Sequence, residues 1–169
     1  GQNKITTRTE TVVDKVTKKE TKVEKTGPVV RNTEKNLKLL ADSWRMAQEV
    51  DKAIPVLEKA AKMSKEGKSY VLLGNLYLSE DKVNLAVEAI KKGLDKGKIT
   101  KISQVYLTLG QAYYELQEFD NAKKQFRIAA RDDDKKIKKQ ANNWIKYTEN
   151  EETRVKSLAL RRDYIQSQS

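Results

Sequence analysis

Apolar residues recur along most of the chain at the spacing of one face of an α-helix. From Thr33, which suits an N-cap position, the first such series is Leu37, Leu40, Ala41 and Trp44, the i, i+3, i+4, i+7 pattern of an amphipathic helix. A second series follows Val50 and comprises Ala53, Ile54, Leu57, Ala60 and Ala61. We therefore expect two antiparallel helices joined by a short turn.

The same alternation returns twice. The next pair is marked by Tyr70, Leu73, Gly74, Tyr77, Ala86, Ile90 and Gly93, and the third by Tyr106, Leu109, Gly110, Tyr113, Ala122, Phe126 and Ala129. The alanines that follow the three turns, Ala53, Ala86 and Ala122, lie 33 and 36 residues apart. Residues 31–134 are thus predicted to form three repeats at about 34–66, 67–100 and 103–134, whose aromatic residues are packing residues rather than a cofactor site.

Residues 135–169 are predicted to form a capping helix and tail. Ile137, Ala141, Trp144, Ile145 and Thr148 share one side of the expected helix, and charged residues occupy the other, as expected of an end unit with one covered and one wet face. The helix is expected to run to about Tyr164. The preceding run Asp132-Asp133-Asp134 suits a helix start better than a calcium loop, which would need a glycine and further ligands.

Residues 1–30 differ from the rest of the chain. They hold seven threonines and few apolar residues, chiefly Val12, Val13, Val16 and Val23. Such a stretch favours a flexible leader that ends near Gly27-Pro28. The alternative is a remnant of a preceding repeat, because Val12, Val16 and Val23 fall near helical spacing.

Composition narrows the possible functions. The chain has no cysteine and no histidine, so the commonest nucleophile, general base and metal ligands are missing. We expect neither an enzyme nor a bound cofactor or metal. The net charge of +11 divides as +3 over residues 1–30, +3 over 31–134 and +5 over 135–169. Because most basic residues alternate with acidic ones, a nucleic-acid or anionic-surface binder is only the alternative hypothesis. No apolar run is long enough to span a membrane.

The third repeat carries a recognisable motif. Tyr106, Leu109, Gly110, Tyr113, Ala122 and Phe126 resemble the tetratricopeptide repeat signature W-x2-L-G-x2-Y…A-x3-F…P, which recurs about every 34 residues. The second copy departs with Tyr70 and Ile90 at the large positions, and the first with Leu37 and Ala41, while the repeat proline is missing throughout. The resemblance implies an all-α, right-handed superhelix of three helix pairs plus a capping helix, acting as a non-catalytic protein-interaction scaffold.

In that family the first helices of the pairs line a concave groove. Mapping the signature onto this chain implies the groove positions Lys35, Lys38, Asp42, Arg45, Lys68, Val71, Asn75, Leu78, Gln104, Leu107, Gln111 and Tyr114. They form either a peptide or protein groove or an ordinary solvated helix surface. A clamp for the C-terminal carboxylate of heat-shock chaperones is not expected, because Asp42 stands where such a clamp has an asparagine and would repel a carboxylate.

A further resemblance covers roughly residues 34–150. EKNLKLLADSW (34–44) and QANNWIKYTENE (140–151) look similar to the C-terminal part of bacterial periplasmic tetratricopeptide proteins associated with TonB-ExbB-ExbD transport systems. This resemblance implies a periplasmic scaffold whose protein partners are TonB-ExbB-ExbD components, and an export signal outside this sequence. A general envelope assembly or adaptor protein is the alternative within the same class.

Overall fold

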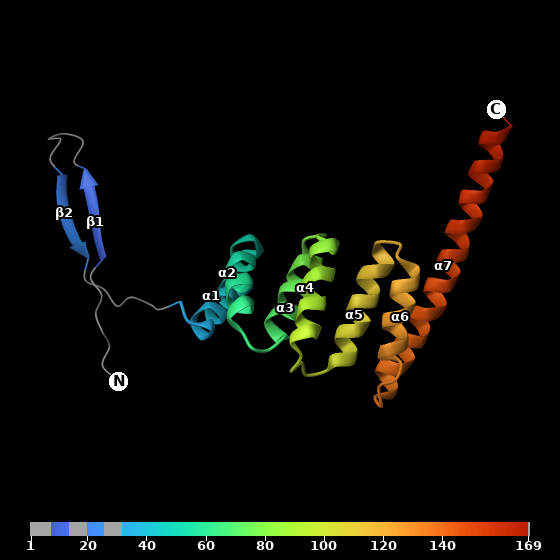
Figure 1. Ribbon diagram of the computed structural model, residues 1–169, viewed down its shortest axis with the longest axis horizontal. Helices are drawn as coiled ribbons and strands as arrows, with labels where there is room; N and C mark the ends of the chain where they lie inside the picture. The colour runs from blue at the N-terminus through green and yellow to red at the C-terminus, as the bar shows by residue number, and fades with distance from the viewer. Residues whose placement is uncertain (1–7, 14–19, 26–31, 169) are drawn as a thin grey trace.

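The computed structural model describes residues 8–13, 20–25 and 32–168 of the chain. Seven helices follow one another over residues 34–167: α1 (Glu34–Met46), α2 (Val50–Met63), α3 (Lys68–Ser79), α4 (Val83–Lys96), α5 (Ile102–Glu115), α6 (Phe119–Ala129) and α7 (Lys135–Ser167). Figure 1 shows them side by side in chain order as one stacked array. The predicted all-α superhelix of three pairs and a capping helix is confirmed for this part of the chain.

Two strands precede the helices. β1 (Arg8–Val13) and β2 (Glu20–Lys25) pair antiparallel, with Arg8 opposite Lys25 and Val13 opposite Glu20. A remnant of a helical repeat would require helical backbone here, and these two segments are extended instead, in line with the β-branched threonines and valines they contain. The prediction of a flexible leader otherwise concerns residues 1–7, 14–19 and 26–30, which lie outside the described part of the chain.

Small residues let the helices of each pair approach closely. Ala53, Ala86 and Ala122 are fully buried, one in each second helix. On the facing first helices, a Cβ atom added to Gly74 would lie 2.5 Å from Cγ1 of Ile90, and one added to Gly110 would lie 2.5 Å from Cε1 of Phe126. Since those distances are below van der Waals contact, only glycine fits the two crossings, and Ile90 and Phe126 fill the space that its missing side chain leaves.

Each second helix is covered by the first helix of the next unit. The interior accordingly divides into two apolar clusters, one centred on α1 to α3 and the other on α4 to α7. Leu78 packs against both clusters. The apolar interior is therefore continuous along the array, as the stacking of repeats requires.

The turns inside the three pairs share one geometry. Gln48, Asp81 and Gln117 have φ angles of 60°, 55° and 58°, in the left-handed region. The residue after each donates its backbone N–H to a carbonyl near the end of the first helix, to Trp44, Tyr77 and Tyr113 in turn, at 2.9 Å. Each of these hydrogen bonds satisfies a carbonyl near the end of a first helix. The residue with left-handed φ lets the chain reverse direction there. This geometry places a non-glycine residue in a strained backbone conformation three times.

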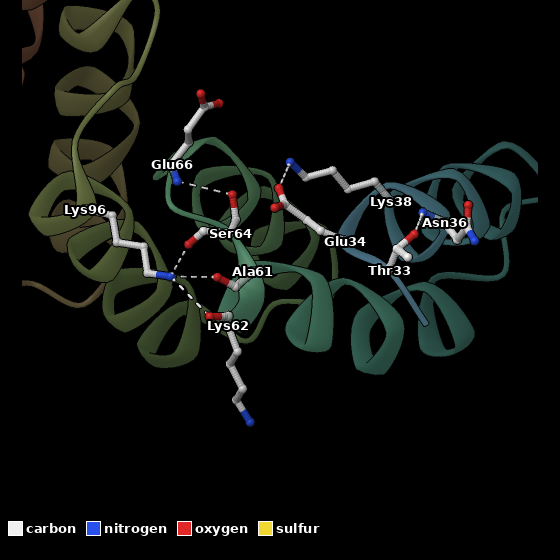
Figure 2. Close-up of polar contacts among 9 residues, drawn as sticks. All are labelled: Thr33, Glu34, Asn36, Lys38, Ala61, Lys62, Ser64, Glu66 and Lys96. Carbon is white, nitrogen blue, oxygen red and sulfur yellow. Dashed lines mark hydrogen bonds and ion pairs between the residues drawn. The ribbon is translucent and has the colours of Figure 1, made fainter. Parts of the chain in front are cut away.

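A lysine joins the first two repeats (Figure 2). Lys96, the last residue of α4, donates from Nζ to the carbonyls of Ala61 (2.9 Å), Lys62 (3.4 Å) and Ser64 (2.5 Å) at the end of α2. The same ammonium lies 5.1 Å from the centroid of the Tyr70 ring. Carbonyls at a helix C-terminus lack partners within the helix and carry the negative end of its dipole. Lys96 therefore caps a helix of the neighbouring pair.

Replacing Gln117 by glycine should stabilise the fold. Glycine adopts a φ near 58° without the steric cost that glutamine bears, although it also gains freedom in the unfolded chain. We expect Gln117→Gly to raise the free energy of unfolding by about 0.5 kcal/mol. Glu115→Gly, in the last turn of α5, is the control and should lower it by up to about 1 kcal/mol. Urea unfolding of both variants measures these changes. A lower free energy of unfolding in both variants would contradict backbone strain at Gln117.

Removing the Lys96 ammonium should weaken the junction between the first two repeats. Lys96→Met keeps most of the aliphatic chain and leaves the α2 carbonyls without their charged donor. We expect the free energy of unfolding to fall by about 1–2 kcal/mol. Lys91→Met, at an exposed position of the same helix, should change it little. Equal effects of the two substitutions in urea unfolding would argue against the cap.

Candidate protein-binding surface

The candidate surface is the side of the first helices α1, α3 and α5 that carries the predicted groove positions, called here the first-helix face. Of its predicted members, five are exposed, namely Lys35, Arg45, Lys68, Asn75 and Gln104. Six are half-buried, namely Lys38, Asp42, Val71, Leu78, Gln111 and Tyr114. The face thus combines exposed polar side chains with the half-buried apolar side chains of Val71 and Leu78.

Leu107 is a correction to the predicted set. Its side chain is 2% exposed and belongs to the second apolar cluster. The physical reason is the position of α5, which contacts α4, α6 and α7. A helix with neighbours on three sides has little surface left, so a position mapped from the repeat signature as open to solvent is buried here.

The charges on α1 are largely paired within the helix. Lys38 forms an ion pair with Glu34, one turn away (Figure 2), and Arg45 pairs with Asp42 at 3.4 Å. The Lys38 ammonium, followed by a hydrogen bond from Ser64, holds the pKa of Glu34 below its usual range. For Lys35 and Lys68, by contrast, the described part of the chain provides no ion-pair partner. These two lysines are the cations that the first-helix face offers to a ligand.

Three polar side chains occupy equivalent positions on the first-helix face. Asp42, Asn75 and Gln111 each directly follow the small residue at the helix crossing, Ala41, Gly74 or Gly110. Asn75 is exposed, and Asp42 and Gln111 are half-buried. An amide side chain both donates and accepts hydrogen bonds, which suits it to pair with the backbone of an extended chain. The repeat geometry therefore forms a row of hydrogen-bonding groups, the polar row, along the array.

The C-terminal end of the face is covered by α7. Trp144 stacks on Phe126 with a centroid distance of 5.6 Å and an interplanar angle of 16°, and meets Tyr114 edge-on at 5.5 Å. Such offset and edge contacts are favourable arrangements of aromatic rings. Tyr114 therefore has a packing role at the α5–α7 contact, and only its remaining surface is available to a ligand.

An ion pair fixes α7 to α6. Lys123 contacts Glu152 at 2.7 Å, and the two side chains are only 13% and 17% exposed. Glu152 also pairs with Lys156 at 2.6 Å. The hydrogen bond from Lys123, together with that from Lys156, lowers the pKa of Glu152 to about 2. This pair is the last polar contact that the structure records between α7 and α6.

A cleft lies on another side of the array and was not predicted. Residues of α2, α3 and α4 line it, namely Glu58, Lys62, Tyr70, Leu73, Tyr77, Leu85, Glu88, Ala89 and Lys92. The Tyr77 hydroxyl donates to Oε1 of Glu58 at 2.5 Å. Burial first, and then this hydrogen bond, raises the pKa of Tyr77 to about 12. Helical spacing marked Tyr77 as a packing residue, and nothing in that spacing indicates a carboxylate partner on the preceding pair.

The described residues include no group of three or more acidic side chains placed to hold a metal ion. Two members of the acidic run act at the start of α7 instead. Asp134 accepts from the backbone N–H of Lys136 at 2.8 Å, and Asp132 accepts from that of Asp134 at 2.7 Å. No described helix combines the length and apolarity that crossing a membrane requires.

Comparison with known families identifies the repeats. The family model for the tetratricopeptide repeat matches residues 67–95 and 103–130, which are the second and third helix pairs. These two helix pairs match the tetratricopeptide repeat. The first pair, α1 and α2, packs on α3 as the matched pairs pack on each other, although its sequence departs further from the signature. No curated protein sequence matches the chain.

Solved structures with the same fold include several tetratricopeptide domains. The MamA protein aligns with a TM-score of 0.60 at 19% identity, covering 77% of this chain and 69% of that one. The Yersinia enterocolitica type III secretion chaperone SycD, in complex with a peptide of the translocator YopD, aligns with a TM-score of 0.59 at 12% identity, over 74% and 98%. The first such domain of Spaghetti, bound to an HSP90 peptide, aligns with a TM-score of 0.57 at 16% identity, over 69% and 90%. At these identities the likeness concerns the fold alone.

The contribution of Glu152 to stability should depend on pH. A carboxyl group whose pKa is lower in the folded than in the unfolded chain stabilises the fold above its unfolded pKa, near 4.5, and loses this effect as the pH falls through the folded pKa. We therefore expect Glu152→Gln to lower the melting temperature at pH 7, and the difference from the parent chain to shrink between about pH 4.5 and 2. Glu149→Gln, an exposed neighbour on α7, is the control. A difference for Glu152→Gln that stays constant with pH would contradict the ion pair.

Proposed function

We propose that the chain is a non-catalytic scaffold whose first-helix face binds an extended peptide segment of a partner protein. The observation that carries this proposal is the polar row of Asp42, Asn75 and Gln111 at equivalent positions of successive first helices. An extended segment presents backbone N–H and C=O groups at a regular spacing, so a row of side-chain donors and acceptors can hold it. Val71 and Leu78, half-buried beside the row, supply apolar contacts for its side chains.

The unpaired cations favour an acidic segment. Lys35 and Lys68 are exposed at the end of the face formed by α1 and α3, whereas Lys38 and Arg45 are already paired with carboxylates of α1. The HSP90 peptide in the Spaghetti complex, SRMEEVD, is itself acidic. In this chain Asp42 would repel any carboxylate bound beside it. We therefore propose that the acidic residues of the segment lie beside Lys35 and Lys68 and that its C-terminus does not bind beside Asp42.

The partner is proposed to be a component of a TonB-ExbB-ExbD system in the periplasm. The resemblance of EKNLKLLADSW and QANNWIKYTENE to periplasmic tetratricopeptide proteins of such systems supports this assignment. The repeat architecture is compatible with it, since a stacked array offers one long surface for a protein segment. A general envelope adaptor would use the same face for other clients.

Binding should weaken when the polar row is truncated. We expect the double variant Asn75→Ala/Gln111→Ala to weaken binding of an acidic extended peptide by about 10-fold, because each lost hydrogen bond costs about 0.5–1.5 kcal/mol. Fluorescence polarisation with acidic, neutral and basic peptides of equal length measures this. The purified periplasmic domains of TonB and ExbD are tested as whole partners in the same way.

The matched control removes two exposed amides elsewhere, Asn84 on α4 and Asn142 on α7. Asn84→Ala/Asn142→Ala should bind as the parent chain does. An equal loss in both double variants would place the ligand outside the first-helix face. Affinity for DNA that falls steeply with salt, and that drops when Lys135, Lys136, Lys138 and Lys139 are neutralised, would support a nucleic-acid binder instead.

A further inference from the structure

The C-terminal half of α7 extends past the repeats. α7 has 33 residues whereas α6 has 11, and Figure 1 shows α7 continuing beyond the ends of α5 and α6. The Lys123–Glu152 ion pair joins the two helices near the start of α6. Residues 152–167, called here the distal segment, are therefore a helix of about 24 Å with little of the repeat array beside it.

The apolar stripe of α7 continues into the distal segment. In the first half the stripe is Ile137, Ala141, Trp144 and Thr148, and it is buried or half-buried against the repeats. At the same helical spacing it runs on through Val155, Leu158 and Ala159, with Arg162 following. Leu158 is 49% exposed. Val155 and Ala159 are half-buried. The face that packs on α6 in one half of α7 is thus only partly covered in the other.

A cleft opens where the distal segment leaves the array. It is lined by the start of α6 and by α7, namely Gln117, Glu118, Phe119, Asp120, Asn121, Glu152, Val155 and Lys156. Phe119 and Val155 give it an apolar part. Its rim on the α6 side carries the carboxylates of Glu118 and Asp120, and both residues are exposed.

The tip of the distal segment has the opposite charge. Arg161 and Arg162 are both exposed there, and Asp163 lies 3.8 Å from Arg162 as a long ion pair. The base of the segment therefore offers the carboxylates of Glu118 and Asp120 beside the cations Arg154 and Lys156, and Asp120 already pairs with Lys123 at 3.0 Å. Only an antiparallel arrangement of two such segments brings the arginines of each tip beside the two carboxylates at the base of the other.

We propose that the distal segment is a self-association surface that pairs antiparallel with the distal segment of a second copy of this chain. Leu158 and Ala159 lie near the two-fold axis of the pair, and Val155 of each copy lies near Arg162 of the other. The tip of one copy reaches the cleft of its partner, where Arg161 and Arg162 meet Glu118 and Asp120. Antiparallel pairing places the two repeat arrays at opposite ends of the paired helices.

A lipid surface fits the distal segment less well. A helix that lies on a membrane gathers its apolar residues on one face and its charges on the other. Here Leu160 and Tyr164, which are 72% and 67% exposed, lie on the side opposite Val155, and Arg162 interrupts the apolar stripe. Apolar residues on two sides of a short helix suit helix pairing along one side better than insertion.

The paired surface is small, so association should be reversible. Four to five helical turns on each side bury less than a standard interface of about 1,600 Å². We expect the molar mass of the full chain, measured by sedimentation equilibrium, to rise from one to two chains as its concentration increases. A single chain at every concentration up to the solubility limit would overturn the proposal.

Cross-linking tests the register, because the chain contains no cysteine. Ala159→Cys should form a disulfide-linked dimer under mild oxidation, whereas Ser157→Cys, on the opposite side of the helix, should not. A mixture of Val155→Cys and Arg162→Cys chains should give the mixed dimer in preference to either homodimer. Equal cross-linking at residues 157 and 159, or preferred Val155→Cys homodimers, would contradict antiparallel pairing.

Charge reversal tests the partner. Reversing the tip alone, with Arg161→Glu and Arg162→Glu, should abolish the dimer. Adding Glu118→Lys and Asp120→Lys to the same chain should restore self-association but not association with the parent chain. All four residues are exposed, and unchanged helical circular dichroism verifies the fold. Failure of the fourfold variant to recover the dimer would exclude the proposed base-to-tip contact.

Discussion

The whole structure depends on one constraint, which is that a two-helix pair cannot bury both apolar sides of its second helix by itself. α2, α4 and α6 each pack on their own first helix and still need a neighbour on the far side. That neighbour is the first helix of the next unit, and for α6 it is α7. Close packing at Gly74 and Gly110 sets the separation within a pair. Stacking then follows, because any uncovered side would expose large apolar residues such as Phe126 and Ile90.

This constraint also decides where a ligand can bind. The first helices have one side left over after packing within and between pairs, and their polar residues gather there. Lys96 contributes indirectly, since by capping α2 from α4 it joins the two repeats that carry Asp42 and Asn75. The spacing of the polar residues along the first helices therefore depends on the junctions between the repeats.

Periodicity was sufficient to predict the helices, the small residues at their crossings and the capping helix, because each rests on local spacing. Two features depend on contacts distant in sequence and escaped it. Leu107 is buried because α5 has α7 as a third neighbour. Lys96 binds carbonyls more than thirty residues earlier. The pairing of β1 with β2 was also missed, since the valines there fall near helical spacing while their β-branched neighbours favour strands.

α7 shows how an array of this kind ends. Its first half resembles any first helix on the side that covers α6, with Trp144 stacked on Phe126, but its outer side is polar and needs no further partner. That change of composition stops the stacking. The stripe nevertheless continues beyond Glu152, where the repeats cover it only in part, and two exposed arginines lie at the tip of the helix. A segment that only had to end the array would not need Leu158 and Ala159 in register with Trp144, and their presence is the reason to assign the distal segment a contact of its own.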